Sequence, residues 1–144
     1  MIPTSRDAIR VLVIVDDSQL VRECVQHGLQ EMGWKVIALD SEFGVLRKIV
    51  AADPSIVLMD LNMPLLDGMS LVRCLRRDLK QSSYPIVLYS DAPTKVLEEA
   101  CLKAGADGYL AKTDNMRYLD FLLRGLLSRS GDSVPVKTRA AGGC

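Results

Sequence analysis

The sequence feature that most constrains the fold is a set of short, unbroken apolar runs, each of which stops at a polar residue. The three strongest runs are Val11–Val15, which stops at Asp16, Ile56–Met59, which stops at Asp60, and Ile86–Tyr89, which stops at Ser90. Continuous rather than alternating hydrophobicity indicates strands that are buried on both faces, as in a parallel sheet. Weaker runs at 35–39 and 109–111 bring the expected number of strands to five.

Longer amphipathic stretches separate these runs, and their apolar residues recur at the spacing of a helix. They cover residues 20–32, 43–50, 71–79, 96–104 and 116–126. In the second stretch Phe43 and Ile49 belong to the expected apolar stripe, and Ser41 is the expected N-cap. Alternation of strand and helix predicts an α/β, doubly wound fold with five parallel strands and helices on both faces.

A chain of 144 residues is long enough for one domain with its own core. The periodic pattern predicts an N-terminal extension over 1–10, the domain over 11–130 and a flexible C-terminal tail over 131–144. We find no internal repeat, and we expect no second domain for output, because too few residues follow the last helix.

Net charge, apolar runs and cysteine spacing indicate which kinds of binding partner and which cellular compartment the chain fits. The chain has 18 Lys and Arg against 18 Asp and Glu, and this balance argues against a nucleic-acid binder held by bulk charge. No apolar run approaches the length of a membrane span, and residues 1–10 do not resemble a signal peptide. The cysteines are far apart and form neither a disulfide pattern nor a metal-binding pair, so we expect a protein of the reducing cytoplasm; they are Cys24, Cys74, Cys101 and Cys144. Cys144 lies in the predicted tail and is expected to be a reactive thiol.

Polar residues follow the predicted strands at the edge of the sheet where ligands bind in such folds. Asp16 and Asp17 follow the first strand, Asp60 the third, Ser90 the fourth and Lys112 the fifth. Converging carboxylates repel one another unless a cation lies among them, and such an oxygen-rich set suits Mg²⁺. Together with a lysine and a hydroxyl, they indicate phosphoryl transfer onto an Asp carboxylate, and no nucleotide-binding P-loop is present.

Three segments that carry the aspartates and the lysine resemble the receiver domain of bacterial two-component response regulators, and the spacing of Ser90 from Asp60 and Lys112 agrees with it. Residues 15–18 (VDDS) resemble the acidic pair, 60–68 (DLNMPLLDG) the segment around the phospho-accepting aspartate, and 105–112 (GADGYLAK) the last strand with its lysine. The resemblance extends from about Val11 to about Leu127. It implies a flavodoxin-like, doubly wound parallel sheet with strand order 2-1-3-4-5, five helices and a single domain.

The resemblance also implies a role for each matching residue. Asp60 would accept a phosphoryl group from a histidine kinase or phosphotransferase. Asp17, Asp60 and the backbone carbonyl of Asn62 would bind Mg²⁺ directly, with Asp16 acting through water. Lys112 would pair with the phosphoryl oxygens.

Two further residues would form the switch that the resemblance implies. Ser90 would move to hydrogen-bond a phosphoryl oxygen, and Tyr109 would turn inward when Ser90 moves. The surface of the fourth helix, last strand and last helix would then bind an output protein or serve a phosphorelay. The chain would therefore be a stand-alone signalling protein and not an enzyme, and a monomer or weak homodimer that binds neither nucleic acid nor membrane.

The sequence departs from the family pattern at two positions. Asp91 stands after Ser90, where a small residue is usual, and it either narrows the entrance to the site or points into solvent and caps the next helix. Thr113 stands after Lys112, where a proline is common, so the last loop loses a rigid constraint.

Other functions fit the residues less well. A pseudo-receiver, which signals without phosphate, is the main alternative, and labelling by acetyl phosphate distinguishes it from a receiver. A haloacid-dehalogenase-type phosphatase requires a D-x-D motif after the first strand, which Asp16-Asp17-Ser18 does not provide. A flavin-binding site would require the loop after the first strand to bind phosphate, and the acidic residues of that loop would repel it. His27 lies on a predicted helix and is expected to be an ordinary surface histidine.

Overall fold

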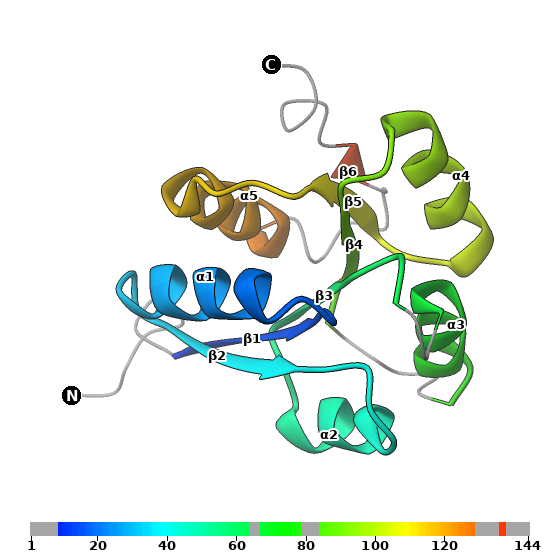
Figure 1. The fold of residues 1–144 in the computed structure, drawn as a ribbon, viewed down its shortest axis with the longest axis horizontal. Helices are drawn as coiled ribbons and strands as arrows, with labels where there is room; N and C mark the ends of the chain where they lie inside the picture. The colour runs from blue at the N-terminus through cyan, green and yellow to red at the C-terminus, as the bar shows by residue number, and fades with distance from the viewer. Residues whose placement is uncertain (1–8, 64–66, 79–83, 129–135, 138–144) are drawn as a thin grey trace.

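Strands and helices alternate along the chain, as the computed structural model in Figure 1 shows. The structure describes residues 9–63, 67–78, 84–128 and 136–137. The strands are β1 Arg10–Val15, β2 Trp34–Leu39, β3 Ile56–Met59, β4 Ile86–Ser90, β5 Gly108–Ala111 and β6 Val136–Lys137. The helices are α1 Gln19–Gln30, α2 Val45–Ala52, α3 Gly68–Asp78, α4 Thr94–Ala104 and α5 Met116–Ser128.

The strands form one parallel sheet in the order β2-β1-β3-β4-β5-β6. The five-stranded order 2-1-3-4-5 and the doubly wound α/β class that the sequence predicts are therefore confirmed. In the register, Val15 lies beside Leu39 of β2 and Met59 of β3. The carboxyl ends of β1 and β3 consequently meet at one edge of the sheet, where the polar residues follow.

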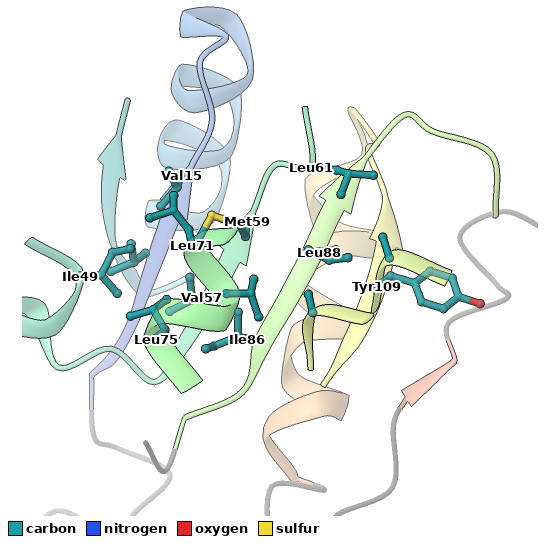
Figure 2. Packing of buried hydrophobic residues seen from close by; sticks show 14 of the residues in the cluster. Val15, Ile49, Val57, Met59, Leu61, Leu71, Leu75, Ile86, Leu88 and Tyr109 are labelled. Carbon is teal, nitrogen blue, oxygen red and sulfur yellow. The ribbon is translucent and has the colours of Figure 1, made fainter. Parts of the chain in front are cut away.

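Alternate residues of each strand face two separate hydrophobic cores. Val57 and Met59 pack with α2, α3 and α4 on one face, and Figure 2 shows part of this cluster. Ile56 and Leu58 pack with α1 and α5 on the other. This division explains the unbroken apolar runs, because both sides of each central strand are covered by helices. Figure 1 shows α1 and α5 together on one side of the sheet.

The start of α2 differs from the sequence prediction. Gly44, with φ +88°, precedes the helix, which begins at Val45 and has no side-chain cap. The prediction of Ser41 as N-cap is therefore wrong; Ser41 is buried instead, and its N–H donates to Asp40 Oδ1. Phe43 is also not in the core, because it lies before the helix and is fully exposed.

The sheet continues beyond the five predicted strands. Val136 and Lys137 of β6 lie beside Gly108 and Tyr109 of β5, in parallel register. These two residues fall within 131–144, where the sequence predicts a flexible tail, and a two-residue strand is too short to show any periodicity. The remainder of that tail, with Cys144, and residues 1–8 of the predicted extension lie outside the described residues.

Helix lengths and compositions bear on membrane insertion. In the ranges that the structure covers, no helix combines the length and the apolar character needed to cross a bilayer.

Candidate functional site

Three aspartates meet at the carboxyl edge of the sheet. Carboxylate oxygens of Asp16, Asp17 and Asp60 all lie within 4.8 Å of one another. Backbone bonds that continue the sheet beyond its strands hold two of these residues: Asp16 N–H donates to Leu39 O at 3.0 Å, and Asp60 N–H donates to Val15 O at 2.9 Å. The convergence predicted from the ends of the apolar runs is therefore present in the structure.

The turn after β1 fixes the orientation of Asp16. Its Oδ1 accepts the Ser18 N–H at 2.9 Å, and Ser18 Oγ in turn accepts the Val21 N–H as the N-cap of α1. The Arg22 guanidinium donates to the Asp16 carbonyl at 2.8 Å. Sequence reasoning missed Arg22, because a single arginine on a helix carries no signal of a contact with the preceding turn.

Asp60 is buried under the start of α3. Its Oδ1 receives the Asn62 N–H at 3.4 Å, and the Gly68 N–H donates to the neighbouring Leu61 carbonyl at 3.4 Å. A Cβ added at Gly68 would overlap the Asp60 carbonyl oxygen. Glycine at this position of the 60–68 segment therefore permits close approach of the helix to the aspartate backbone. Residues 64–66 of that segment lie outside the described residues.

Lys112 is the cation that faces the aspartates. Its Nζ lies 2.8 Å from Asp16 Oδ2 and 3.5 Å from Asp60 Oδ1, and its side chain is only 15% exposed. The contact with Asp16 is a close ion pair. The Lys112 backbone N–H donates to Ser90 O at 3.0 Å, which fixes where the side chain begins.

These contacts shift the pKa values of both partners. Burial raises the pKa of Asp60 to about 6, the Asp16 charge adds to the rise, and Lys112 opposes it. Burial alone would lower the pKa of Lys112, but the facing carboxylates of Asp16 and Asp60 raise it above its ordinary value. Ionisation of Asp60 therefore has a free-energy cost when no cation other than Lys112 is present in the site.

The donor set fits a hard divalent cation. Three carboxylates face one ammonium within the cluster, which leaves an excess of two negative charges if all four groups are ionised. Oxygen ligands with one solvent-facing member, Asp17, match the preference of Mg²⁺ for carboxylates together with water. The Asn62 carbonyl as a further ligand stays a prediction.

Ser90 and Tyr109, the two proposed switch residues, are both buried. Ser90 is 1% exposed, and its Oγ accepts the Ala92 N–H at 3.1 Å. Tyr109 is buried on β5, and in Figure 2 its ring points away from Leu88 of β4. Ser90 adjoins Lys112 through its backbone carbonyl, whereas Tyr109 pairs with Leu88 further down the strand, and the switch role of both residues stays a prediction.

Asp91 shares a cleft with Lys112, but none of the three aspartates lines that cleft. It is exposed and lines a cleft of about 250 Å³ together with Lys112, Thr113 and residues of α1. The alternative that Asp91 caps α4 is wrong, because the N-cap is Pro93 and no side chain caps that helix. Asp91 is not a member of the three-aspartate cluster, and whether it narrows the entrance to the site stays a prediction. His27 is exposed on α1, as expected.

Comparison with known proteins gives one consistent family. Residues 12–123 match the family model described as the response regulator receiver domain. The transcriptional regulatory protein CseB of Streptomyces avermitilis is 31% identical over 130 residues, which cover 90% of this chain and 54% of that protein. The chemotaxis protein CheY1 of Helicobacter pylori is 33% identical over 104 residues, 70% of this chain and 83% of that protein.

Solved structures agree with the sequence comparisons. The Vibrio cholerae chemotaxis protein CheY4 superposes with a TM-score of 0.74 at 27% identity, covering 82% of this chain and 98% of its own. The chain spans about half the length of the transcriptional regulators it matches, which include PrrA of Mycobacterium tuberculosis at 33% identity, 87% of this chain and 52% of that protein.

Proposed function

The chain belongs to the response regulator receiver domain family, and on that premise we propose that Asp60 accepts a phosphoryl group from a phosphohistidine donor in the presence of Mg²⁺. One observation carries this proposal: the carboxylates of Asp16, Asp17 and Asp60 converge within 4.8 Å, with the Lys112 ammonium facing two of them. An acidic cluster with two buried members has a large electrostatic cost, which a bound cation relieves. The cation and Lys112 would then offset the negative charge that the phosphoryl group adds.

The proposed step is a displacement at phosphorus. An Asp60 carboxylate oxygen forms a bond to phosphorus while the bond from phosphorus to the histidine nitrogen breaks, and that nitrogen leaves with the electron pair. The product is an aspartyl phosphate. Lys112 supports this step by holding positive charge 3.5 Å from Asp60 Oδ1, where charge on the phosphoryl oxygens accumulates.

The metal would be held by the same acidic cluster. Asp17, Asp60 and the Asn62 carbonyl are its proposed direct ligands, with Asp16 acting through water. When bound, Mg²⁺ supplies neutralisation of the phosphoryl oxygens. Asp16 has a second task in this chain, because its Oδ2 lies 2.8 Å from Lys112 Nζ and orients that ammonium toward the site.

Phosphorylation is proposed to act through Ser90 and Tyr109. The Ser90 hydroxyl would leave the Ala92 N–H, 3.1 Å away, and donate to a phosphoryl oxygen. Tyr109 would then turn inward and change the surface formed by α4, β5 and α5, to which an output protein or a phosphorelay partner would bind. The new charge and acceptor oxygens of the phosphoryl group provide the bias between the two states.

Acetyl phosphate labelling tests this function directly. Purified protein is incubated with radiolabelled acetyl phosphate, with Mg²⁺ or with EDTA, and bound label is counted after gel separation. We expect label that requires Mg²⁺, is lost in Asp60→Asn and is released by hydroxylamine, as an acyl phosphate is. Asp114→Asn changes an exposed aspartate outside the acidic cluster and is the matched control.

No incorporation, or equal incorporation into Asp60→Asn, would contradict the proposal and favour a pseudo-receiver. The donor in the cell is proposed to be a histidine kinase or phosphotransferase, in the cytoplasm. Free thiols at Cys24, Cys74 and Cys101 agree with a reducing compartment. The transcriptional role named for the longer relatives is not carried over, because this chain covers about half of their length.

A further inference from the structure

The loop between β5 and α5 carries Lys112 and is held by a tyrosine from the neighbouring strand. The Thr113 N–H donates to the hydroxyl oxygen of Tyr89 at 3.2 Å, and the same hydroxyl donates to the Thr113 carbonyl at 3.2 Å. One phenol group therefore binds both backbone polar groups of the residue that follows Lys112. Tyr89 lies on β4 directly before Ser90, so the clamp joins two strand ends.

This contact depends on the residue type at position 113. A proline there would have no backbone N–H to donate, so the hydroxyl would keep only its bond to the carbonyl. Threonine supplies the N–H, and its side chain also accepts the Asn115 N–H at 3.0 Å within the loop. Threonine in place of the common proline at position 113 therefore allows the Tyr89 hydroxyl to form both of its hydrogen bonds.

The hydroxyl of Tyr89 is fixed in position by its ring. The residue is 1% exposed and packs within the core between the sheet and helices α1 and α5, together with Leu110 and Leu119. Burial also raises the pKa of Tyr89 to about 12, so the phenol stays neutral and both donates and accepts at neutral pH. A rigid aromatic ring with two satisfied hydrogen bonds is a firm anchor for a loop.

The anchored loop places the functional ammonium. Lys112 immediately precedes Thr113, and its Nζ lies 2.8 Å from Asp16 Oδ2 and 3.5 Å from Asp60 Oδ1. A backbone displacement at residue 113 is transmitted to Lys112 through one peptide unit. We propose that Tyr89 is a positioning residue for phosphoryl transfer, which holds Lys112 in place by clamping the Thr113 backbone.

This inference rests on the proposed function, and its test separates the two. Tyr89→Phe removes the hydroxyl and keeps the ring. Tyr84→Phe is the matched control, because the Tyr84 hydroxyl is buried but has no hydrogen-bond partner among the described residues. The first measurement is amide hydrogen exchange at Thr113 by NMR, which does not depend on phosphorylation. We expect faster exchange by about tenfold in Tyr89→Phe and no change in Tyr84→Phe.

The second measurement is the initial rate of acetyl phosphate labelling at saturating Mg²⁺. We expect Tyr89→Phe to label about tenfold more slowly with a similar unfolding midpoint, and Tyr84→Phe to label at the wild-type rate. Thr113→Pro provides the rescue: in that background there is no N–H to leave unpaired, so adding Tyr89→Phe should slow labelling by less than about threefold.

The outcomes are distinct. If wild-type protein takes no label, the proposed function fails, and the exchange rates still report on the clamp. If wild-type protein takes label and Tyr89→Phe matches its rate, Tyr89 does not position Lys112, and the proposed function stands. An equal loss of rate on removing the hydroxyl in both backgrounds would show that the effect does not depend on the Thr113 N–H, and it would overturn the two-bond clamp.

Discussion

The Lys112 ammonium lies closer to Asp16 than to Asp60, with Nζ at 2.8 Å from Asp16 Oδ2 and at 3.5 Å from Asp60 Oδ1. Asp16 is completely buried, so this ion pair is shielded from solvent on the aspartate side. The lysine is therefore held mainly by a residue other than the proposed phospho-acceptor. Lys112 therefore keeps Asp16 as an ionic partner whether Asp60 is ionised, protonated or phosphorylated.

Removing the lysine should destabilise the fold most strongly when no divalent cation is present. Lys112→Met leaves the buried Asp16 carboxylate without its partner, and we expect a loss of about 2 kcal/mol or more in the free energy of unfolding in EDTA. Added Mg²⁺ should recover part of that loss. Urea denaturation measures both, and Lys103→Met, at an exposed position of α4, should stay close to wild type. Equal stability of the two variants in EDTA would contradict this prediction.

Removing the charge of Asp60 should have the opposite effect. Its folded pKa is about 6, above the ordinary value of 3.8, so the folded state binds the proton more tightly than the unfolded chain. Ionisation of Asp60 therefore lowers stability as pH rises from about 4 to about 6. In EDTA at pH 7.5 we expect Asp60→Asn to be more stable than wild type by roughly 3 kcal/mol.

The pH dependence of this difference checks its cause. The advantage of Asp60→Asn should shrink as pH falls through 6 and approach zero only below the ordinary value of 3.8, where Asp60 is protonated in both states. Asp114→Asn, at an exposed position, should show no such trend. A constant difference across this range would mean that the gain does not come from the charge of Asp60.

Gly68 should not tolerate a side chain, whereas Gly125 should. An alanine at Gly68 overlaps the Asp60 carbonyl oxygen, so the start of α3 or the backbone of Asp60 must shift. We expect Gly68→Ala to lose at least about 1 kcal/mol of stability and to slow acetyl phosphate labelling. Gly125 is exposed on α5 with nothing near the added methyl group, so Gly125→Ala should gain about 0.5–1 kcal/mol. Thermal unfolding of both variants measures the contrast.

Alkaline pH should weaken the fold through Tyr89. Burial raises the pKa of Tyr89 from 10.0 to about 12, so the stability associated with the neutral phenol is present below pH 10 and is lost as pH rises toward 12. This loss amounts to roughly 3 kcal/mol between those limits. Denaturation curves between pH 9 and 11 should show a shallower decline for Tyr89→Phe than for wild type. Parallel declines would place the alkaline sensitivity elsewhere.

Asp91 should slow the approach of anionic donors. Its carboxylate stands at the rim of the cleft that Lys112 lines, so it repels acetyl phosphate through solvent. We expect Asp91→Ala to label about two- to threefold faster than wild type at low ionic strength and equally fast near 1 M salt, where screening is strong. Glu99→Gln removes one charge from an exposed position on α4 and is the control. A rate gain that persists in high salt would indicate a steric effect.

The sequence predicts the sheet and the acidic cluster well because both depend on strong local signals. Unbroken apolar runs arise where both faces of a strand are covered, and parallel strands bring their carboxyl ends together, so Asp16 and Asp60 had to meet. Lys112 follows the same logic at the end of β5. The Mg²⁺ ligands and the switch roles of Ser90 and Tyr109 rest on the family resemblance.

Other features depend on contacts that no local pattern reveals. The hydroxyl of Tyr89 reaches Thr113, 24 residues along the chain, although in the sequence Tyr89 is only the last member of an apolar run. Phe43 fits the helical spacing of its neighbours, but the left-handed backbone of Gly44 delays the helix and leaves Phe43 in solvent. Periodicity describes which face a helical residue takes and does not determine where the helix begins.

The pairing of β6 with β5 affects where the chain can be shortened. Helical periodicity alone would suggest cutting after residue 130, which would remove Val136 and Lys137 from the side of Gly108 and Tyr109. The outer backbone groups of β5 would then form an open strand edge, and open edges recruit strands from other molecules. A fragment trimmed in this way should be more prone to self-association and precipitation than the 144-residue chain, so protein prepared for solution work should retain residues 131–144.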